Sequence, residues 1–256
     1  MLSKAEAKRL QGLARARARS ESGLFLAEGV RVVEDLLDSP IVPRLAVIST
    51  SLEDTDRGAA LAARLRQHVR TETVPDHELR RLADTESPQG VVVAAEIPRP
   101  QLEALVLPED ALIVVLDAVQ DPGNFGTIVR SADAFGATAV CTLAGTVDPW
   151  NPKAVRGAAG SSLRVPVIET DGATLLPFLE GAGFRILGAD MGGADIGGVV
   201  AGARTALVLG NEGAGIGVEL RAHLDGTVAV PIRGSAESLN VGVAAGILLY
   251  MLSRES

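Results

Sequence analysis

The run Ala111–Leu116 consists entirely of apolar residues, and turn-forming residues follow it directly. Such a run is typical of a strand that is covered on both faces, as the strands of parallel sheets are. Further strand-like runs lie at 138–143, 185–189, 205–209 and 227–230, with segments of helical composition near 127–135, 152–159, 174–179, 218–223 and 239–252. This alternation predicts an α/β domain with a parallel sheet, in which functional residues gather where strands end and loops begin.

The first hundred residues predict a second, smaller α/β unit. We expect strands at 23–29, 45–49, 69–74 and 89–95, and helices at 5–19, 30–37, 58–68 and 78–83. Two prolines within three residues, Pro98 and Pro100, mark a linker after this unit. The predicted organisation is a small domain over residues 1–97, a linker over 98–108 and a larger domain over 109–256.

Several classes of protein are excluded by the composition. No apolar run is long and uninterrupted enough for a membrane span, and the N-terminus lacks the apolar middle of a signal peptide. Cys141 is the single cysteine, which leaves no intrachain disulfide and no thiolate metal site. The three histidines are scattered without ligand spacing, so we expect no metal. The expected location is the cytoplasm.

Charge is distributed unevenly along the chain. The formal net charge of −8 argues by itself against nucleic-acid binding, because phosphate contacts provide most of such affinity. The N-terminal segment is nevertheless basic, with Glu6 set against Lys4, Lys8, Arg9, Arg15, Arg17 and Arg19. Arginine suits bidentate phosphate contacts, but a solvated helix face has the same composition. Considered in isolation, the segment is compatible with either interpretation.

Two of the predicted strand-end loops carry polar residues in unusual settings. The loop 121–126 contains Asn124, and Arg130 lies about one turn beyond it if the next helix begins near Gly126. Each residue alone is typical of a turn, a cap or a solvated helix surface. The loop 209–217 places Glu212 among glycines directly after a strand. Because it lacks the dinucleotide spacing and the phosphate-loop lysine, it indicates a backbone that approaches some other ligand.

A third loop lies between Val230 and Val241. An apolar strand ends at Pro231, a loop of small residues follows, and Ser238, Leu239 and Asn240 open a long apolar helix. Polar side chains and free backbone N–H groups therefore meet at a helix N-terminus. We interpret this loop as one that holds a cofactor.

Together the three loops resemble the ordered motifs of the SpoU (TrmH-type) branch of the SPOUT methyltransferases. The matching residues are Asn124-x-Gly126-x-x-x-Arg130, Leu209-Gly210-x-Glu212-x-x-Gly215 and Pro231-x-x-Gly234-x-x-x-Ser238-Leu239-Asn240-Val241. The first unit resembles the L30e-like substrate-binding domain of the family, through Gly23-x-Phe25-Leu26-x-Glu28-Gly29 and Gln89-Gly90. One departure is Gly242, at a position where the family commonly has serine.

The resemblance implies a C-terminal parallel-sheet domain with a trefoil knot, a homodimer formed through that domain, and S-adenosylmethionine as cofactor. It implies methylation of a ribose 2′-hydroxyl in RNA, with ribosomal RNA as the favoured substrate and tRNA as the alternative. The implied cofactor-binding residues are Leu209, Gly210, Gly215, Val230, Ile232 and Leu239, and the implied reaction centre comprises Asn124, Arg130, Glu212, Ser238 and Asn240. The expected RNA contacts are Arg9, Arg15, Arg17 and Arg19, from the basic N-terminal segment, and Arg130, from the first motif.

The chemistry requires activation of a very weakly acidic hydroxyl. Arginine keeps its proton in proteins, so we expect Arg130 to stabilise developing negative charge or to clamp a phosphate rather than to act as a base. Glu212 could orient the polar network or help to accept the proton. Two other classes of function remain as alternatives: a non-catalytic RNA-binding or ribosome-associated protein of the same fold, and a nucleotide-dependent enzyme using the glycines after Glu212.

Overall fold

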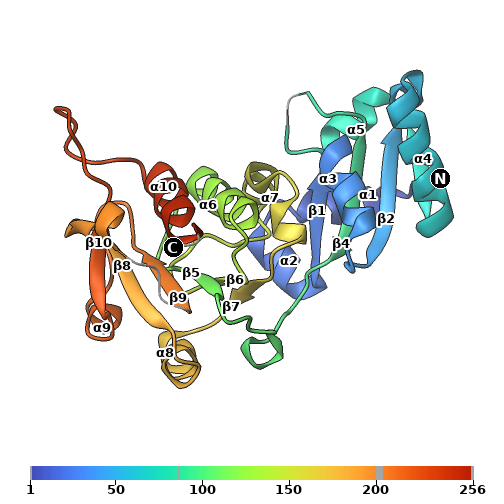
Figure 1. Cartoon of the computed structure of the whole chain (residues 1–256). Coiled ribbons are helices and arrows are strands. Elements are labelled where there is room, and N and C mark those ends of the chain that lie inside the picture. Colours follow the sequence, from blue (N-terminus) through green and yellow to red (C-terminus); the bar gives the residue numbers. More distant parts are fainter. Residues whose placement is uncertain (1, 86, 200–203, 255–256) are drawn as a thin grey trace. The chain divides into compact units, whose positions relative to one another are not determined.

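The computed structural model describes residues 2–85, 87–199 and 204–254. The chain divides into two compact units (Figure 1). The first unit comprises Met1–Pro98 and Asp148–Leu163, and the second comprises Arg99–Val147 and Arg164–Ser256. The chain thus passes from the first unit to the second inside the proline-rich stretch, and it returns to the first unit for one short segment.

The first unit is built on a mixed four-stranded sheet in the order β1-β4-β2-β3. Its strands are β1 (Leu24–Glu28), β2 (Pro43–Ser49), β3 (Thr71–Val74) and β4 (Val91–Glu96), and its helices are α1 (Lys4–Gly12), α2 (Ala16–Ser22), α3 (Val30–Asp38), α4 (Asp56–His68), α5 (Asp76–Leu82) and α7 (Pro152–Ala158). Strand β4 is antiparallel to both neighbours, whereas β2 and β3 are parallel. The helix predicted over 5–19 is two helices, separated by a turn after Gly12.

Alternate residues of the central strand β4 serve two separate cores, as the two-residue period of a strand requires. Val92 and Ala94 pack with apolar residues of α1 and α5, whereas Val91 and Val93 pack with those of α3 and α4. Helices therefore cover both faces of the sheet. The core beneath α3 and α4 also contains Trp150, Val155 and Leu163 from the segment that returns to this unit.

The returning segment is fixed by a buried arginine. Arg19 is 2% exposed, and its guanidinium donates to Asp148 through both Nε and Nη2, with the Nε bond at 2.9 Å. Its Nη1 donates to the backbone oxygen of Leu13 at 2.7 Å. Next to this pair, the ring of Trp150 packs against Phe25 with centroids 4.7 Å apart. One side chain thus joins α2, the end of α1 and the returning segment.

We expect Arg19→Met to lower the free energy of unfolding of the first unit by about 3 kcal/mol, because it leaves Asp148 without its counter-ion. Trp150 is the single tryptophan and lies in this unit, so its fluorescence during urea denaturation measures the change. The matched control is Arg17→Met, which removes an exposed pair with Glu21 and should cost less than about 0.5 kcal/mol. Equal effects of the two substitutions would contradict a structural role for the buried arginine.

The second unit is built on a six-stranded sheet in the order β10-β8-β9-β5-β6-β7, in which all neighbouring strands are parallel. Its strands are β5 (Leu112–Leu116), β6 (Ala139–Thr142), β7 (Val167–Glu169), β8 (Arg185–Asp195), β9 (Thr205–Leu209) and β10 (Gly226–Ala229), and its helices are α6 (Pro122–Ala134), α8 (Gly172–Gly181), α9 (Val218–Arg221) and α10 (Val241–Leu252). The predicted parallel sheet is confirmed, with the addition of β7. The predicted knot stays a prediction.

Helices α6 and α10 lie side by side (Figure 1). Glycines on α10 permit this close approach: a Cβ at Gly242 would lie 3.1 Å from Thr127, and one at Gly246 would lie 3.2 Å from Ser131 Oγ. The departure from the family pattern at residue 242 is therefore matched by the threonine opposite it, which occupies the space that a serine side chain would need.

Candidate active site

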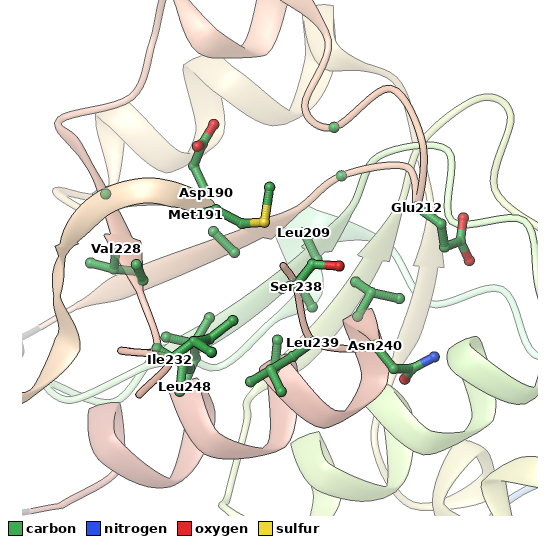
Figure 2. Close-up of a pocket in the computed structure, with 18 of the residues that line it drawn as sticks. Asp190, Met191, Leu209, Glu212, Val228, Ile232, Ser238, Leu239, Asn240 and Leu248 are labelled. Atoms are coloured by element: carbon green, nitrogen blue, oxygen red, sulfur yellow. The ribbon is translucent and has the colours of Figure 1, made fainter. Parts of the chain in front are cut away.

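A pocket of about 860 Å³ lies in the second unit, where β8, β9 and β10 end (Figure 2). Its apolar floor includes Leu209, Val228 and Leu248, which are all buried. All six residues predicted to bind the cofactor line this pocket, namely Leu209, Gly210, Gly215, Val230, Ile232 and Leu239. Of the predicted reaction-centre residues, Glu212, Ser238 and Asn240 also line it. The loop after β9 and the loop before α10 thus line one cavity.

The loop after β9 is closed by its own backbone. Asn211 and Gly215 exchange two N–H···O bonds of 3.0 and 2.9 Å, and the Oδ1 of Asn211 accepts the N–H groups of Gly213 and Ala214. Gly210 lies so close to the backbone of Gly215 that a Cβ there would overlap with it. Gly215 itself has φ +70°, a left-handed conformation that favours glycine. These glycines are therefore required by the loop that shapes the pocket wall.

The loop before α10 leaves its side chains exposed on the pocket surface. Ile232 and Leu239 are 37% and 36% exposed, although both are large apolar residues on the pocket. Asn240 ends the loop as the N-cap of α10, and its Oδ1 accepts the N–H groups of Gly242 and Val243. Ser238 lies on the pocket beside them (Figure 2). Exposed apolar side chains on a concave surface are suited to an amphipathic ligand.

A chain of side-chain hydrogen bonds joins the three motifs. Asn240 Nδ2 donates to Asn124 Oδ1 at 2.8 Å, and Asn124 Nδ2 donates to Glu212 Oε1 at 2.9 Å. Helix α6 begins at Pro122 with Asp121 as its N-cap, earlier than the sequence predicted, so Asn124 lies in the first helical turn. The network connects the starts of α6 and α10 with the loop that follows β9.

The carboxylate of Glu212 is held by this network. Partial burial acts to raise its pKa, but hydrogen bonds from Asn124 and from backbone N–H groups, including those of Gln120 and Asp121, bring the pKa below its ordinary value. A carboxylate with a lowered pKa is ionised at neutral pH and is a weak base. The geometry therefore favours an organising role over proton acceptance.

Arg130 is exposed and, among the described residues, it has no hydrogen-bond or ion-pair partner and is not part of the pocket lining. With α6 beginning at Pro122, it lies two turns into the helix and about 120° around the axis from Asn124. The expected position one turn above the helix start is wrong for this reason. Within one chain, the structure brings together four of the five predicted reaction-centre residues and leaves Arg130 outside.

The predicted RNA contacts belong to the first unit, apart from Arg130. Arg9, Arg15 and Arg17 are exposed, and Arg17 pairs with Glu21 four residues later. The prediction for Arg19 is wrong: its guanidinium is buried and fully engaged by Asp148 and Leu13, so it is not available to a phosphate.

The pocket-lining residues that sequence reasoning missed include Asp190, Met191 and Arg221. Asp190 directly follows the predicted strand 185–189, so its position at a strand end was an available signal. Arg221 had none, because it reaches the pocket from the short helix α9, whose sequence resembles any solvated helix.

Other kinds of site receive no support from the described part of the chain. It holds no group of three or more His, Cys, Asp or Glu residues that could bind a metal ion. None of its helices has the length and apolar character needed to span a bilayer. Burial raises the pKa of the Cys141 thiol to about 12, so this residue is not a nucleophile.

The pocket fits S-adenosylmethionine in size and chemistry. Its volume lies within the usual range for small-molecule sites, roughly 300–1,000 Å³, and its floor is apolar as an adenine ring requires. Four carboxylates line it, those of Asp190, Asp195, Glu212 and Glu237, against the single guanidinium of Arg221 among the described lining residues. This acidic lining suits a molecule that carries a sulfonium and an ammonium group.

Comparison with known proteins agrees with this geometry. Residues 111–250 match the SpoU rRNA Methylase family, and residues 4–93 match the MRM3-like substrate binding domain. The chain is 34% identical to the 23S rRNA (guanosine(2553)-2′-O)-methyltransferase RlmP of Bacillus subtilis, over 91% of this chain and 90% of that protein. It is also 34% identical to the 23S rRNA (uridine(2479)-2′-O)-methyltransferase of Streptomyces viridochromogenes, over 93% of this chain and 85% of that protein.

Among solved structures, the SpoU methyltransferase AviRb from Streptomyces viridochromogenes, in complex with the cofactor AdoMet, superposes with a TM-score of 0.88 at 30% identity. The match covers 98% of this chain and 97% of that chain. The residues matched in these comparisons include both domains, the parallel sheet and the three motifs. The chain belongs to the SpoU rRNA methylase family and is an S-adenosylmethionine-dependent RNA ribose 2′-O-methyltransferase.

Proposed function

We propose that this enzyme methylates a ribose 2′-hydroxyl of 23S ribosomal RNA. Two relatives that align over most of their length are both named for that RNA, and they are named for different nucleotides of it, a guanosine and a uridine. The proposal therefore extends to the RNA molecule and not to the position of the methyl group. Ribosomal RNA is preferred to tRNA on the same ground.

The hydrogen-bond chain from Asn240 through Asn124 to Glu212 carries the proposal for the reaction centre. It fixes the start of α6 and the start of α10 at the edge of the pocket, so that polar groups are in place before the RNA arrives. Asn124, Glu212, Ser238 and Asn240 orient the reacting ribose and the loops around it. Glu212 remains ionised and holds Asn124 in the orientation that accepts from Asn240.

The cofactor pocket acts mainly through backbone and apolar surface. Leu209, Gly210 and Gly215 supply one wall, while Val230, Ile232 and Leu239 supply the other. When it is bound, S-adenosylmethionine supplies an electrophilic methyl group. The residues of the chain exclude water from the apolar floor and hold the two loops at a fixed separation.

We assign Arg130 the task of stabilising the developing alkoxide or of clamping the adjacent phosphate, in the pocket of a second subunit. Its absence from the described lining of its own chain's pocket supports this assignment. A homodimer through the C-terminal domain is supported by Val243, Ile247 and Tyr250, which are 50%, 37% and 49% exposed and recur on α10 at intervals of four and three residues. Such a stripe is suited to burial against another helix.

The small domain over residues 1–97 is proposed to bind the RNA, the linker to span 98–108 and the catalytic domain to span 109–256, although residues 148–163 of that range pack in the first unit. Arg9 and Arg15 are exposed and, within the described residues, form no ion pair. They are therefore free to meet phosphates, whereas Arg17 must first release Glu21.

The proposed substrate is tested with the purified enzyme, tritiated S-adenosylmethionine and separate samples of unmethylated 23S rRNA, 16S rRNA and total tRNA. We expect kcat/KM for 23S rRNA to be at least about ten times that for 16S rRNA or tRNA, because the ratio of kcat/KM values measures discrimination between substrates. Alkaline hydrolysis should leave the label in an uncleaved dinucleotide, because a 2′-O-methyl group blocks cleavage there. Preferential labelling of tRNA, or label on a base, would contradict the proposal.

A further inference from the structure

Arg221 joins three segments of the pocket wall. Its Nη2 donates to Asp190 Oδ2 at 2.7 Å, and its Nε donates to the backbone oxygen of Ile216 at 3.0 Å. The same guanidinium lies beside Gly215, where an added Cβ would be 3.4 Å from Nη2. We propose that Arg221 is a positioning residue that, with Asp190, holds the glycine loop 210–216 in the shape that binds S-adenosylmethionine. This inference rests on the cofactor assignment made above.

The segment that carries Asp190 is a bulge in β8. Thr227 of β10 pairs with Gly188, but the next residue, Val228, pairs with Ala194, so residues 189–193 leave the ladder. Four of these residues line the pocket, namely Ala189, Asp190, Met191 and Gly193. A bulge redirects side chains and is held by whatever bonds its own residues make. The carboxylate of Asp190 supplies such bonds, since it accepts the N–H of Gly192 at 3.0 Å as well as the guanidinium.

The glycine loop is fixed on its opposite side by other groups. Asp117, directly after β5, accepts the N–H of Gly217 at 2.6 Å, and Asn211 Nδ2 donates to the oxygen of Ala118 at 2.9 Å. These two bonds attach the loop to the end of β5. Arg221 supplies the corresponding attachment to β8, so its loss would free one side of the loop while the other side stays in place.

The two bonds of Arg221 require a planar fork. Nε and Nη2 address a carbonyl oxygen and a carboxylate at the same time, which an ammonium group on a flexible stem does not reproduce. Bonds between a charged donor and a carboxylate are also stronger than neutral ones. The arrangement therefore predicts a graded series of variants, in which lysine preserves the ion pair and loses the bond to Ile216.

The experiment measures the Kd for S-adenosylmethionine by calorimetry, without RNA, for Arg221→Met, Arg221→Lys, Asp190→Asn and the double variant Asp190→Asn with Arg221→Met. We expect Arg221→Met to raise Kd about tenfold, because it removes both hydrogen bonds of the guanidinium while the bonds to Asp117 and Ala118 still hold the other side of the loop. Arg221→Lys should lie between it and the wild type. The double variant should be no weaker than Arg221→Met, since the two residues act as one unit. The KM for S-adenosylmethionine should rise in parallel, with a smaller change in kcat and none in the KM for RNA.

The control is Arg64→Met, which removes an arginine of similar exposure that pairs with Asp38 in the first unit. It should leave the Kd unchanged, and thermal melting should be alike for the two arginine variants. Wild-type affinity in Arg221→Met would overturn the inference. A loss of affinity accompanied by a fall in melting temperature beyond that of the control would overturn it also, because global destabilisation would then explain the loss. Failure of the wild-type enzyme to bind S-adenosylmethionine would instead overturn the cofactor assignment.

Discussion

Arg130→Ala is expected to reduce kcat by about a hundred- to a thousandfold, the range found when a preorganised group that stabilises transition-state charge is removed. The Kd for S-adenosylmethionine should not change, because Arg130 is assigned to the alkoxide or phosphate of the RNA and not to the cofactor. Steady-state kinetics on 23S rRNA measures kcat, and calorimetry measures the Kd. Arg130→Lys should recover little of the loss, since an ammonium does not reproduce the bidentate guanidinium.

Mixed dimers decide where Arg130 acts. Arg130→Ala subunits are combined with subunits whose pocket cannot bind the cofactor, for example those with Gly210→Val, which introduces a side chain where even a Cβ would overlap the loop backbone. If the arginine serves the partner's pocket, about a quarter of the wild-type activity should return from an equal mixture, because half of the randomly assorted dimers are mixed and each of these has one complete site of two. No recovery would assign the arginine to its own chain. Full activity of Arg130→Ala alone would remove it from the reaction.

Asn240→Asp is the second substitution with a large expected effect, and it separates two roles of one side chain. An aspartate keeps the oxygen that accepts from Gly242 and Val243 at the start of α10, so the helix cap is preserved. It cannot donate to Asn124 Oδ1, and it sets two oxygens against each other at the present distance of 2.8 Å. We expect kcat/KM to fall about a hundredfold, as for other losses of a preorganised polar contact.

The matched control for that substitution is Asn151→Asp. Asn151 caps α7 through its Oδ1, which accepts the N–H of Lys153, and it lies in the first unit. Both variants should melt within a few degrees of the wild type, because Asp and Asn are equivalent caps. Only the variant at position 240 should lose activity. Wild-type activity of Asn240→Asp would mean that the hydrogen bond between Asn240 and Asn124 has no part in the reaction.

The arrangement of the second unit was largely predictable. Continuous apolar runs such as Ala111–Leu116 indicate strands buried on both faces, and the structure places this run as β5, between β9 and β6 in the sheet. The residues expected to bind cofactor all reached one pocket because strands of a parallel sheet end on the same side. The start of α6 was placed too late, since the loop-forming Pro122 and Gly123 occupy its first turn, where proline is well tolerated.

Arginine was the residue type that the sequence described least well. Nothing in the sequence distinguishes the roles of four arginines. In the structure, Arg9 is exposed without a partner in the described residues, and Arg17 forms a surface pair with Glu21. Arg19 is buried against Asp148, and Arg221 supports the pocket. The long flexible side chain permits all four outcomes. The carboxylate that lies near each arginine decides the outcome. For the three paired arginines, that carboxylate is 4 residues away in the sequence for Arg17, 129 for Arg19 and 31 for Arg221.

The sequence by itself determined the family, the parallel sheet, the cofactor and the three loops that carry the motifs, because these depend on apolar runs and on short motifs whose residues are neighbours in the chain. Tertiary structure alone decided that Asn124, Glu212 and Asn240 form one hydrogen-bond chain, that residues 148–163 complete the core of the first unit, and that Arg130 lies outside its own pocket. Each of these joins or separates residues far apart in the chain. A hydrogen bond depends on distances of about 3 Å and on direction, and sequence patterns specify neither across such separations.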